Sequence, residues 1–492
     1  MILKHVKELV GGGLVYGLSG MITSALMVFL VPIYTRLFSP AEYGVLNLVN
    51  TSYILLSLFV IFGLDNSAAL WYWQTEHEAD RKKTFASWAY YSFFVSSILS
   101  ALIVLFAAPI SVLLLKDDAY WPIIALAGTS LTFASLQKVS NIWFRVRKKP
   151  VWAVSLAVTI SLTTIGLTLY LVVGRRFGIV GVYWAQLGGS IVGFVISLVL
   201  LRDWILPVHF RLKRLWEMLH FGAPLVPAAL AFWGMNSAGG FFIQHYLGKT
   251  EVGLYQLGLS LSAVVGILLS GFIQAWSPFA FSITKDAGHR EIYAEIFRLY
   301  IHWGGLAVMG MFLFSPEVVA IIAPPAYSGA APVSGLLALN LVILNAAQIV
   351  AIGCAIAKTN TPYSKAVIVG AGVSVALFMV LIPYAGKEGA VAAAITGNLI
   401  VLIFVYRSAQ KLYFVPYEFV QGILQLLGTL LVSFGLLTIS NELPIQLSII
   451  VRTSVFLLAL GLVAYHTWRA TGDSSYSGLA TVSIDEEEDP DS

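Results

Sequence analysis

Long apolar segments separated by short polar ones dominate the hydrophobic pattern of the chain. Segments of about 20 residues recur, and a helix of that length crosses a hydrocarbon core of about 30 Å. They lack the alternation of a membrane β-strand, so backbone groups in lipid must be satisfied within helices. We therefore predict an all-α integral membrane protein with about 14 transmembrane helices, at residues 12–34, 43–64, 84–107, 119–143, 151–173, 178–201, 221–246, 252–279, 294–315, 330–356, 362–383, 388–410, 418–440 and 446–468.

The composition agrees with this pattern and excludes a water-soluble fold. Of the 492 residues, 58% are hydrophobic and 11% are charged, with a formal net charge of +4. Cys354 is the only cysteine, which excludes an internal disulfide and any Cys-based metal or redox site. Two lysines precede the first apolar segment, but that segment contains no small-residue cleavage site. We therefore expect it to be a retained first span.

The distribution of Lys and Arg among the polar segments predicts the orientation in the membrane. If the N-terminus is cytoplasmic, most of the 29 Lys and Arg residues lie on the cytoplasmic side, as the positive-inside rule requires. Both termini are then cytoplasmic. Lys138 lies inside a span, and the opposite side receives Arg36, Lys116, Arg175, Arg176, Lys249, Lys387 and Arg452.

Two regions of the chain match each other at a nearly constant offset. The residues Glu42-Tyr43-Gly44 correspond to Glu251-Val252-Gly253, 209 residues later, and each set precedes or opens a span. A second match joins the segment that begins at Gly181 with the segment that begins at Gly389, at an offset of 208 residues. Each match falls at the same point in the count of helices. The pattern therefore indicates an internal duplication of six helices.

An even number of helices keeps both copies in the same orientation, so an axis along the membrane normal should relate them. Two such bundles facing each other suit alternating access, in which one bundle rocks against the other. The linker between them is basic and reads as an interfacial amphipathic helix or, because Pro207 interrupts it, as an irregular surface segment. We predict an N-terminal six-helix bundle, a cytoplasmic linker, a C-terminal six-helix bundle, two further helices and an acidic disordered tail, at residues 1–201, 202–220, 221–416, 417–469 and 470–492.

At this point the sequence resembles a known family. The stretch PIYTRLFSPAEYGVLNL at residues 32–48, the weaker Trp276-Ser277-Pro278-Phe279, the six-plus-six duplication and the two extra helices carry the resemblance. They resemble the polysaccharide transporter (Wzx-type) branch of the multidrug/oligosaccharidyl-lipid/polysaccharide (MOP) flippase superfamily. By architecture the resemblance covers essentially the whole chain.

The resemblance implies a function, a substrate and a location. It implies a flippase that moves a polyprenyl-diphosphate-linked oligosaccharide from the inner to the outer leaflet of the bacterial cytoplasmic membrane, for surface polysaccharide biosynthesis. Such a headgroup cannot cross lipid unaided, because burying ionised and hydrated groups is very costly. A polysaccharide polymerase and a chain-length regulator are further partners that it suggests, and nothing in the sequence points to nucleic acid.

Charged residues within the spans are scarce, so each one is a candidate for the transport route. Lys138 either faces a cleft or extends to the cytoplasmic headgroups. Arg298 and His302 share one helical face; Arg298 could hold a phosphate, or pair with Glu295 or Glu291 on its own helix. His302 is also a candidate for ion coupling.

Two further charged residues lie at the ends of predicted spans. Asp65 is a candidate for ion coupling, although an Asp followed by Asn and Ser at a helix end is also typical of a cap. Arg36 belongs to the stretch that resembles the family and could contact diphosphate; the alternative is an anchoring contact to headgroups or to Glu42.

Amide side chains are spaced to form polar stripes on single helical faces. Amides both donate and accept hydrogen bonds, so they suit sugar hydroxyls, although contacts between helices use the same groups. Gln256 also stands 209 residues after Asn47 and completes the repeat described above. The predicted substrate-binding amides are Asn47, Asn50, Gln256, Asn345 and Gln348.

Recognisable enzyme motifs are missing from the sequence. It contains no GxGxxG, P-loop, HExxH, GxSxG or Cys/His cluster, so we expect no enzymatic activity, no cofactor and no metal. A cation-coupled multidrug exporter of the same superfamily remains an alternative, although such proteins typically have twelve spans. A membrane polymerase or ligase of lipid-linked glycans is the other, although one would need a large external loop.

Overall fold

The computed structural model describes residues 28–472 except 287 and 441, and this part of the chain is helical with no strand. Twelve of its helices are long and apolar enough to cross a membrane, so the protein is a multi-pass membrane protein and the predicted all-α class is confirmed. The helices are α2 (Val31–Leu37), α3 (Pro40–Ile61), α4 (Leu64–Gln74), α5 (Glu78–Leu105), α6 (Ala107–Leu115), α7 (Trp121–Val146), α8 (Pro150–Thr168), α9 (Gly178–Leu201), α10 (Leu212–Gly222), α11 (Val226–Ser237), α12 (Gly239–Leu247), α13 (Lys249–Ser282), α14 (His289–Ile322), α15 (Ala331–Val350), α16 (Ile352–Ile356), α17 (Thr361–Leu412), α18 (Phe419–Ser440) and α19 (Ile445–Gly472).

The predicted spans at 362–383 and 388–410 are the two arms of α17. As one straight helix its 52 residues would extend about 78 Å, far beyond a bilayer core. At Gly386 the backbone leaves the helical region (φ 63°, ψ −146°), and the arms fold against each other, with Ser374 donating to the carbonyl of Ala393 at 3.0 Å. Thirteen of the 14 predicted spans therefore correspond to helices of the structure. The remaining one is the first, at 12–34, and most of it lies outside the described residues.

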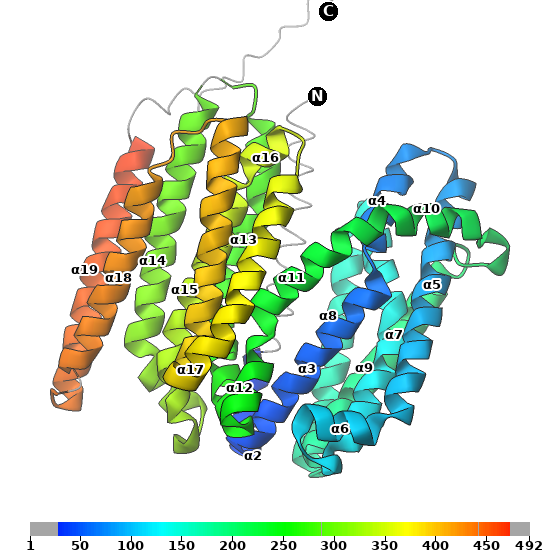
Figure 1. The fold of residues 1–492 in the computed structure, drawn as a ribbon, viewed down its shortest axis with the longest axis horizontal. Coiled ribbons are helices and arrows are strands. Elements are labelled where there is room, and N and C mark those ends of the chain that lie inside the picture. The colour runs from blue at the N-terminus through cyan, green and yellow to red at the C-terminus, as the bar shows by residue number, and fades with distance from the viewer. Residues whose placement is uncertain (1–27, 287, 441, 473–492) are drawn as a thin grey trace, which may run out of the picture.

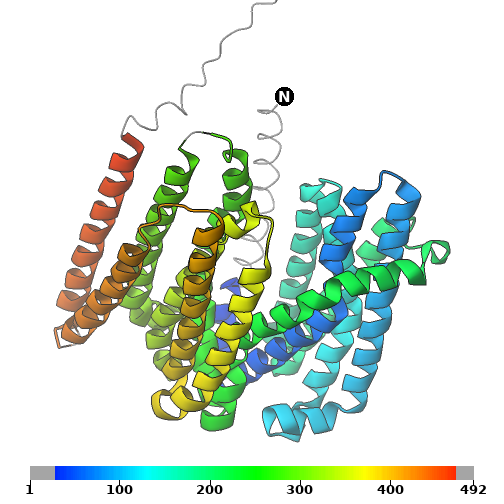
Figure 2. The ribbon, with the colours of Figure 1, turned by 45° about the horizontal axis from the view of Figure 1, so that its top comes forward.

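The helices form two groups that stand side by side in both ribbon views (Figures 1 and 2). In one group α7 packs against α5 and α9, and α9 packs against α8. In the other α15 packs against α13, α14 and α17. We call them the N-terminal half (α3–α9) and the C-terminal half (α11–α19). The predicted domain limits themselves stay a prediction, and the acidic tail falls largely outside the described residues.

The linker between the halves contains a helix that lies across one end of the N-terminal half (Figure 1). Within the predicted linker 202–220, Pro207 starts a short 3₁₀ turn, and α10 follows from Leu212. Met218 is buried whereas Trp216 on the opposite face is 71% exposed, so α10 is amphipathic. The hydroxyl of Ser67 on α4 donates to the carbonyl of Met218 at 2.9 Å, which ties the linker to the N-terminal half.

An ion pair fastens α19 to α14. Arg452 is 5% exposed, and its guanidinium lies 2.7 Å from the carboxylate of Glu317. It also donates to the carbonyl of Leu313 at 2.9 Å and to the hydroxyl of Ser448 at 2.8 Å. Arg452 lies inside α19, within the predicted span 446–468, and Glu317 supplies the countercharge that a buried cation needs.

We expect Gly386→Ala to lower the melting temperature of the purified protein in detergent. The backbone region that Gly386 occupies is essentially restricted to glycine, and forcing another residue into it costs about 1–3 kcal/mol. The matched control is Gly372→Ala in the same element, where an added Cβ would meet open space. An equal melting temperature for both variants would show that the turn of α17 does not need glycine.

Candidate functional site: the contact between the two halves

The two halves meet where α3 crosses α13, and a glycine from each helix lies at the point of closest approach. A Cβ added to Gly44 would overlap the carbonyl oxygen of Lys249, and one added to Gly253 would overlap the carbonyl oxygen of Pro40. Only glycine allows two helix backbones to come this close. The contact therefore explains why both Glu-x-Gly sequences of the repeat end in glycine.

Hydrogen bonds at the N-terminus of α3 fix where this helix begins. The hydroxyl of Ser39 accepts the N–H of Glu42, while the Glu42 carboxylate accepts the N–H of Ser39 at 2.8 Å, and Pro40 occupies the first turn. This capping box satisfies backbone donors that would otherwise be unpaired at the helix start. On the other helix Gly248, with φ 92°, lets the chain turn into α13.

We call the crossing of α3 and α13, with Gly44 and Gly253 at its closest approach, the joint. Residues that correspond in the repeat contact each other across it. The amide of Asn47 donates to the amide oxygen of Gln256, 209 residues away. One further contact, between the hydroxyls of Tyr43 and Ser260 at 3.1 Å, lies beside it. A residue can touch its own counterpart only near the axis that relates the two copies. The axis of the duplication therefore passes between α3 and α13.

One flank of the joint is formed by α2 and the end of α14. The hydroxyl of Thr35 donates to the carbonyl of Ile322 at 3.0 Å, and the Arg36 guanidinium donates to the carbonyl of Ile321 at 3.4 Å. The hydroxyl of Tyr327 donates to a carbonyl at the end of α2 at 2.9 Å. Main-chain acceptors of the C-terminal half thus hold the segment that carries Arg36.

The opposite flank has the equivalent arrangement, at the same offset in sequence. The Lys116 ammonium donates to the carbonyl of His245 at 3.3 Å. His245 is the repeat counterpart of Arg36, because it follows Arg36 by the same 209 residues that separate Asn47 from Gln256. Lys249 also forms an ion pair with Asp117 at 3.3 Å. The N–H of Ala119, followed by Lys249, lowers the pKa of Asp117, so this carboxylate stays ionised at neutral pH.

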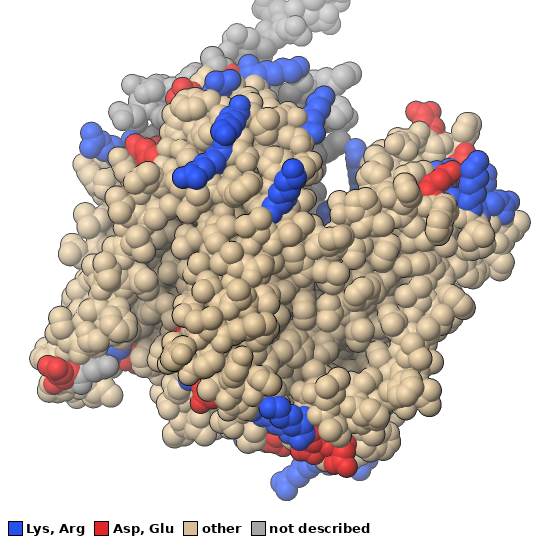
Figure 3. All heavy atoms as spheres, in the orientation of Figure 1, with Lys and Arg blue, Asp and Glu red and all other residues tan. Residues whose placement is uncertain are grey.

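At their other ends the halves diverge. Among the described residues, the helix contacts that bridge the N-terminal and C-terminal halves run mainly through α2 and α3, and α11 contributes one bond, from Trp233 to the carbonyl of Thr51 at 3.3 Å. The space-filling view is hollowed between the halves at its upper end (Figure 3). We call the end with α2, α6 and α12 the joined end, and the end with α4, α10 and α16 the open end.

The structure brings some of the predicted substrate-binding residues together. Asn47 and Gln256 form the joint itself, and Arg36 lies beside it. Asn50 is exposed, one turn further along α3 towards the open end. Lys138 is exposed on α7 in the N-terminal half.

Asn345 and Gln348 lie on α15 and bond to each other, with the amide of Gln348 donating at 3.2 Å. Asp65 lies in the first turn of α4, after Gly63, and its carboxylate accepts a bond from Asn66 at 3.2 Å. No described contact joins these residues to the amide pair at the joint.

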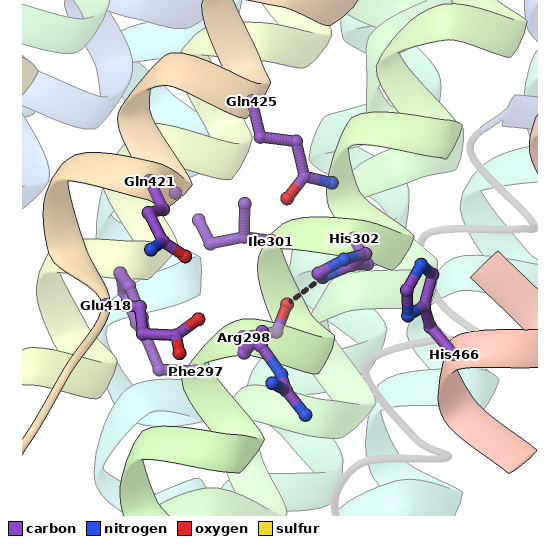
Figure 4. A pocket seen from close by; sticks show the side chains of 9 residues that line it. Phe297, Arg298, Ile301, His302, Glu418, Gln421, Gln425 and His466 are labelled. Atoms are coloured by element: carbon purple, nitrogen blue, oxygen red, sulfur yellow. Dashed lines mark hydrogen bonds between the residues drawn. The ribbon is translucent and has the colours of Figure 1, made fainter. Parts of the chain in front are cut away.

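Arg298 and His302 lie elsewhere, in a pocket of about 240 Å³ between α14, α18 and α19 (Figure 4). The Arg298 guanidinium is 2.6 Å from Glu295, as the alternative in the sequence analysis expected, and the Nδ1 of His302 lies 2.7 Å from the carbonyl of Arg298. His466 faces His302 with ring centres 5.7 Å apart. The shared face of Arg298 and His302 therefore points to α18 and α19 rather than to α3.

The sequence analysis missed a buried amide cluster in the C-terminal half. The amide nitrogen of Asn398 donates to Asn236 at 3.0 Å and to Asn340 at 2.9 Å, and Asn398 is fully buried. The three asparagines join α17, α11 and α15. The signal was present in the sequence, because each is an amide inside a predicted span. No three His, Cys, Asp or Glu side chains among the described residues are grouped to hold a metal ion.

Comparison with known proteins identifies the family. The polysaccharide biosynthesis protein family matches residues 33–332, more than half of the chain and including both helices of the joint. The chain belongs to this family. A search of curated proteins with this sequence found no match.

Solved structures show that this polysaccharide biosynthesis protein has the fold of MOP superfamily transporters. The lipid II flippase MurJ, in an inward closed conformation, is similar with a TM-score of 0.74 at 13% identity, over 93% of this chain and 99% of that one. A multidrug resistance MATE family transporter in an inward-facing conformation has a TM-score of 0.63 at 17% identity, over 80% and 94%. A MOP superfamily transporter from Pyrococcus furiosus has 0.57 at 16%, over 82% and 97%.

We expect Gly253→Val to prevent the joined end from closing, because the added side chain would occupy the space of the Pro40 carbonyl. In a Cys354→Ala background, Asn47→Cys should then react faster with a membrane-impermeant maleimide, since Asn47 is only 7% exposed in the closed joint. Gly266→Ala is the matched control on α13, because its added Cβ makes only an ordinary contact. Equal reaction rates in the two backgrounds would contradict this assignment of the joint.

Proposed function

We propose that this polysaccharide biosynthesis protein is a flippase that moves a polyprenyl-diphosphate-linked oligosaccharide between the leaflets of the bacterial cytoplasmic membrane, from the inner to the outer one. The observation that carries the proposal is the asymmetry between the two ends of the molecule. The halves contact each other around the axis at the joined end and diverge at the open end. A site between them is then accessible from one side at a time, which alternating access requires.

The charge distribution supports an orientation with the open end towards the cytoplasm. Charged side chains lie at the two ends of the molecule with a wide uncharged band between them, and most Lys and Arg side chains visible on this face lie at the upper, open end (Figure 3). Basic residues favour the cytoplasmic side. In this orientation the diphosphate and its sugars enter from the cytoplasm, while the polyprenyl chain stays in lipid.

Exposed polar residues of the N-terminal half would supply contacts for the headgroup. Lys138 offers a positive charge for diphosphate, and Asn50 offers an amide for sugar hydroxyls. Arg36, Asn47 and Gln256 at the joint would meet the headgroup when the outer side opens. The transport proceeds without bond making or breaking, so the protein acts as a transporter and not as an enzyme. A polysaccharide polymerase and a chain-length regulator would act on the translocated product.

Deletion of the gene tests the proposal. Lipid-linked glycan should accumulate with its sugars facing the cytoplasm, because synthesis continues while translocation stops. The measurement is protection of that glycan from a glycosidase added to intact spheroplasts, compared with lysed ones. Surface polysaccharide at the wild-type level, with no accumulated lipid-linked glycan, would exclude the proposed function.

Arg298→Gln tests whether the pocket beside α18 and α19 belongs to the route. If Arg298 binds diphosphate, the variant should fail to complement the deletion while its abundance in the membrane stays normal. Arg290→Gln, also on α14 but stacked on Tyr413 at 4.8 Å, is the matched control and should complement. Full complementation by Arg298→Gln would remove it from the substrate-binding residues.

A further inference from the structure

A cavity of about 540 Å³ opens in the C-terminal half, near the open end. Its walls come from the start of α11, the end of α13, α15 with α16, and the start of α17. None of the substrate-binding residues at the joint lines it, and only Gln348 among the predicted ones does. The cavity is within the range of small-molecule sites, which is roughly 300–1,000 Å³.

The cavity is lined by uncharged groups of three kinds: aliphatic side chains, aromatic rings and polar side chains. Aromatic rings form part of the wall, and one of them, Trp276, is held in place by a bond from its indole N–H to the carbonyl of Ile349 at 3.3 Å and by edge contact with Tyr293. Amides and hydroxyls form the rest of the polar lining. The aromatic residues are Phe232, Trp276 and Tyr363, the polar ones are Ser277, Gln348, Asn360 and Ser364, and the rest of the wall is apolar: Leu225, Ala228, Ala229, Ile273, Ala351, Ile352, Cys354, Ala355 and Val367. No Lys, Arg, His, Asp or Glu is among the described lining residues.

Several of these polar groups have hydrogen-bonding capacity that the protein does not use. The side-chain amide nitrogen of Gln348 donates to Asn345, which leaves the side-chain amide oxygen of Gln348 open to the cavity. Within the described residues, the side chains of Asn360, Tyr363 and Ser364 have no hydrogen-bond partner. Such groups both donate and accept, as sugar hydroxyls do, and the aromatic rings offer a surface for the apolar face of a sugar ring.

We propose that this cavity binds uncharged sugar units of the lipid-linked glycan. The proposal rests on the proposed function and adds to it a separate place for the sugars. A diphosphate does not fit, because the lining offers no cation to compensate its charge. A polyprenyl chain does not fit either, because it would leave the open amides and hydroxyls desolvated without partners. The cavity also gives a role to Trp276 and Ser277, which belong to the second stretch that resembles the family.

Thiol protection tests this binding directly, because Cys354 is the only cysteine in the sequence. In full-length Cys354→Ala protein, Ser277→Cys places one thiol in the cavity wall. The probes are the lipid-linked glycan extracted from the deletion strain, the glycan released from it by mild acid, and the deglycosylated lipid. At ten times the dissociation constant, the intact lipid should slow alkylation by N-ethylmaleimide about tenfold. The released glycan should also slow it, and the deglycosylated lipid should not.

Two comparisons make the result specific to the cavity. Adding Asn360→Ala and Gln348→Ala should abolish the protection, because they remove the amides that face the ligand. Glu76→Cys in the Cys354→Ala background lies in an exposed segment of the N-terminal half, and its alkylation should not change.

Equal protection by the deglycosylated lipid, or no protection by any probe, would overturn the sugar site. The outcome of the deletion decides the flippase function separately. If the deletion strain accumulates lipid-linked glycan but Ser277→Cys is not protected, the flippase function stands and the sugar site falls. If the strain accumulates none, both fall.

Discussion

The approach of two helix backbones at Gly44 and Gly253 is the constraint on which the rest of the structure depends. Because each glycine contacts the helix that carries the other, the two copies of the repeat meet at their common axis. The polar contacts of the joint follow from that meeting: Asn47 lies opposite Gln256, Arg36 of α2 contacts the end of α14 on one flank, and Lys116 contacts α12 on the other. A side chain at either glycine would separate α3 from α13 and shift all these groups out of bonding distance.

Polar contacts between spanning helices tie the C-terminal half together. In the C-terminal half the cluster around Asn398 connects α11, α15 and α17, and the pair of Arg452 with Glu317 connects α19 to α14. A buried charge or amide that loses its partner is costly, so these contacts resist separation of single helices. The weakest connections are therefore those between the halves, where few helices touch.

Much of the fold could be predicted from the sequence, because apolar length and polar breaks report directly on spans. The turn in α17 was predicted as a break between two spans, and Gly386 supplies the backbone conformation that it needs. The repeat was visible as matching residues, but the contact between Gly44 and Gly253 was not. An offset in sequence says that two segments are equivalent, and it does not say where the axis lies.

The candidate site was less predictable for the same reason. Helical spacing correctly put Arg298 and His302 on one face, but the neighbour of that face depends on how the bundle is assembled. The ion pair of Arg452 was not predicted because its countercharge, Glu317, belongs to a helix 135 residues away in sequence. The asparagine cluster was missed because the sequence does not show which of the amides in different spans packing brings together.

The short segment between α10 and α11 limits how far the molecule can open. Upstream of it, Ser67 holds α10 against the N-terminal half, and downstream the amide of Asn398 holds α11 in the C-terminal half. Only the single 3₁₀ turn Ala223–Leu225, stiffened by Pro224, lies between these two anchored helices. Its short backbone limits how far the anchored ends of α10 and α11 can separate, so any larger opening has to come from a change in the angle between the halves.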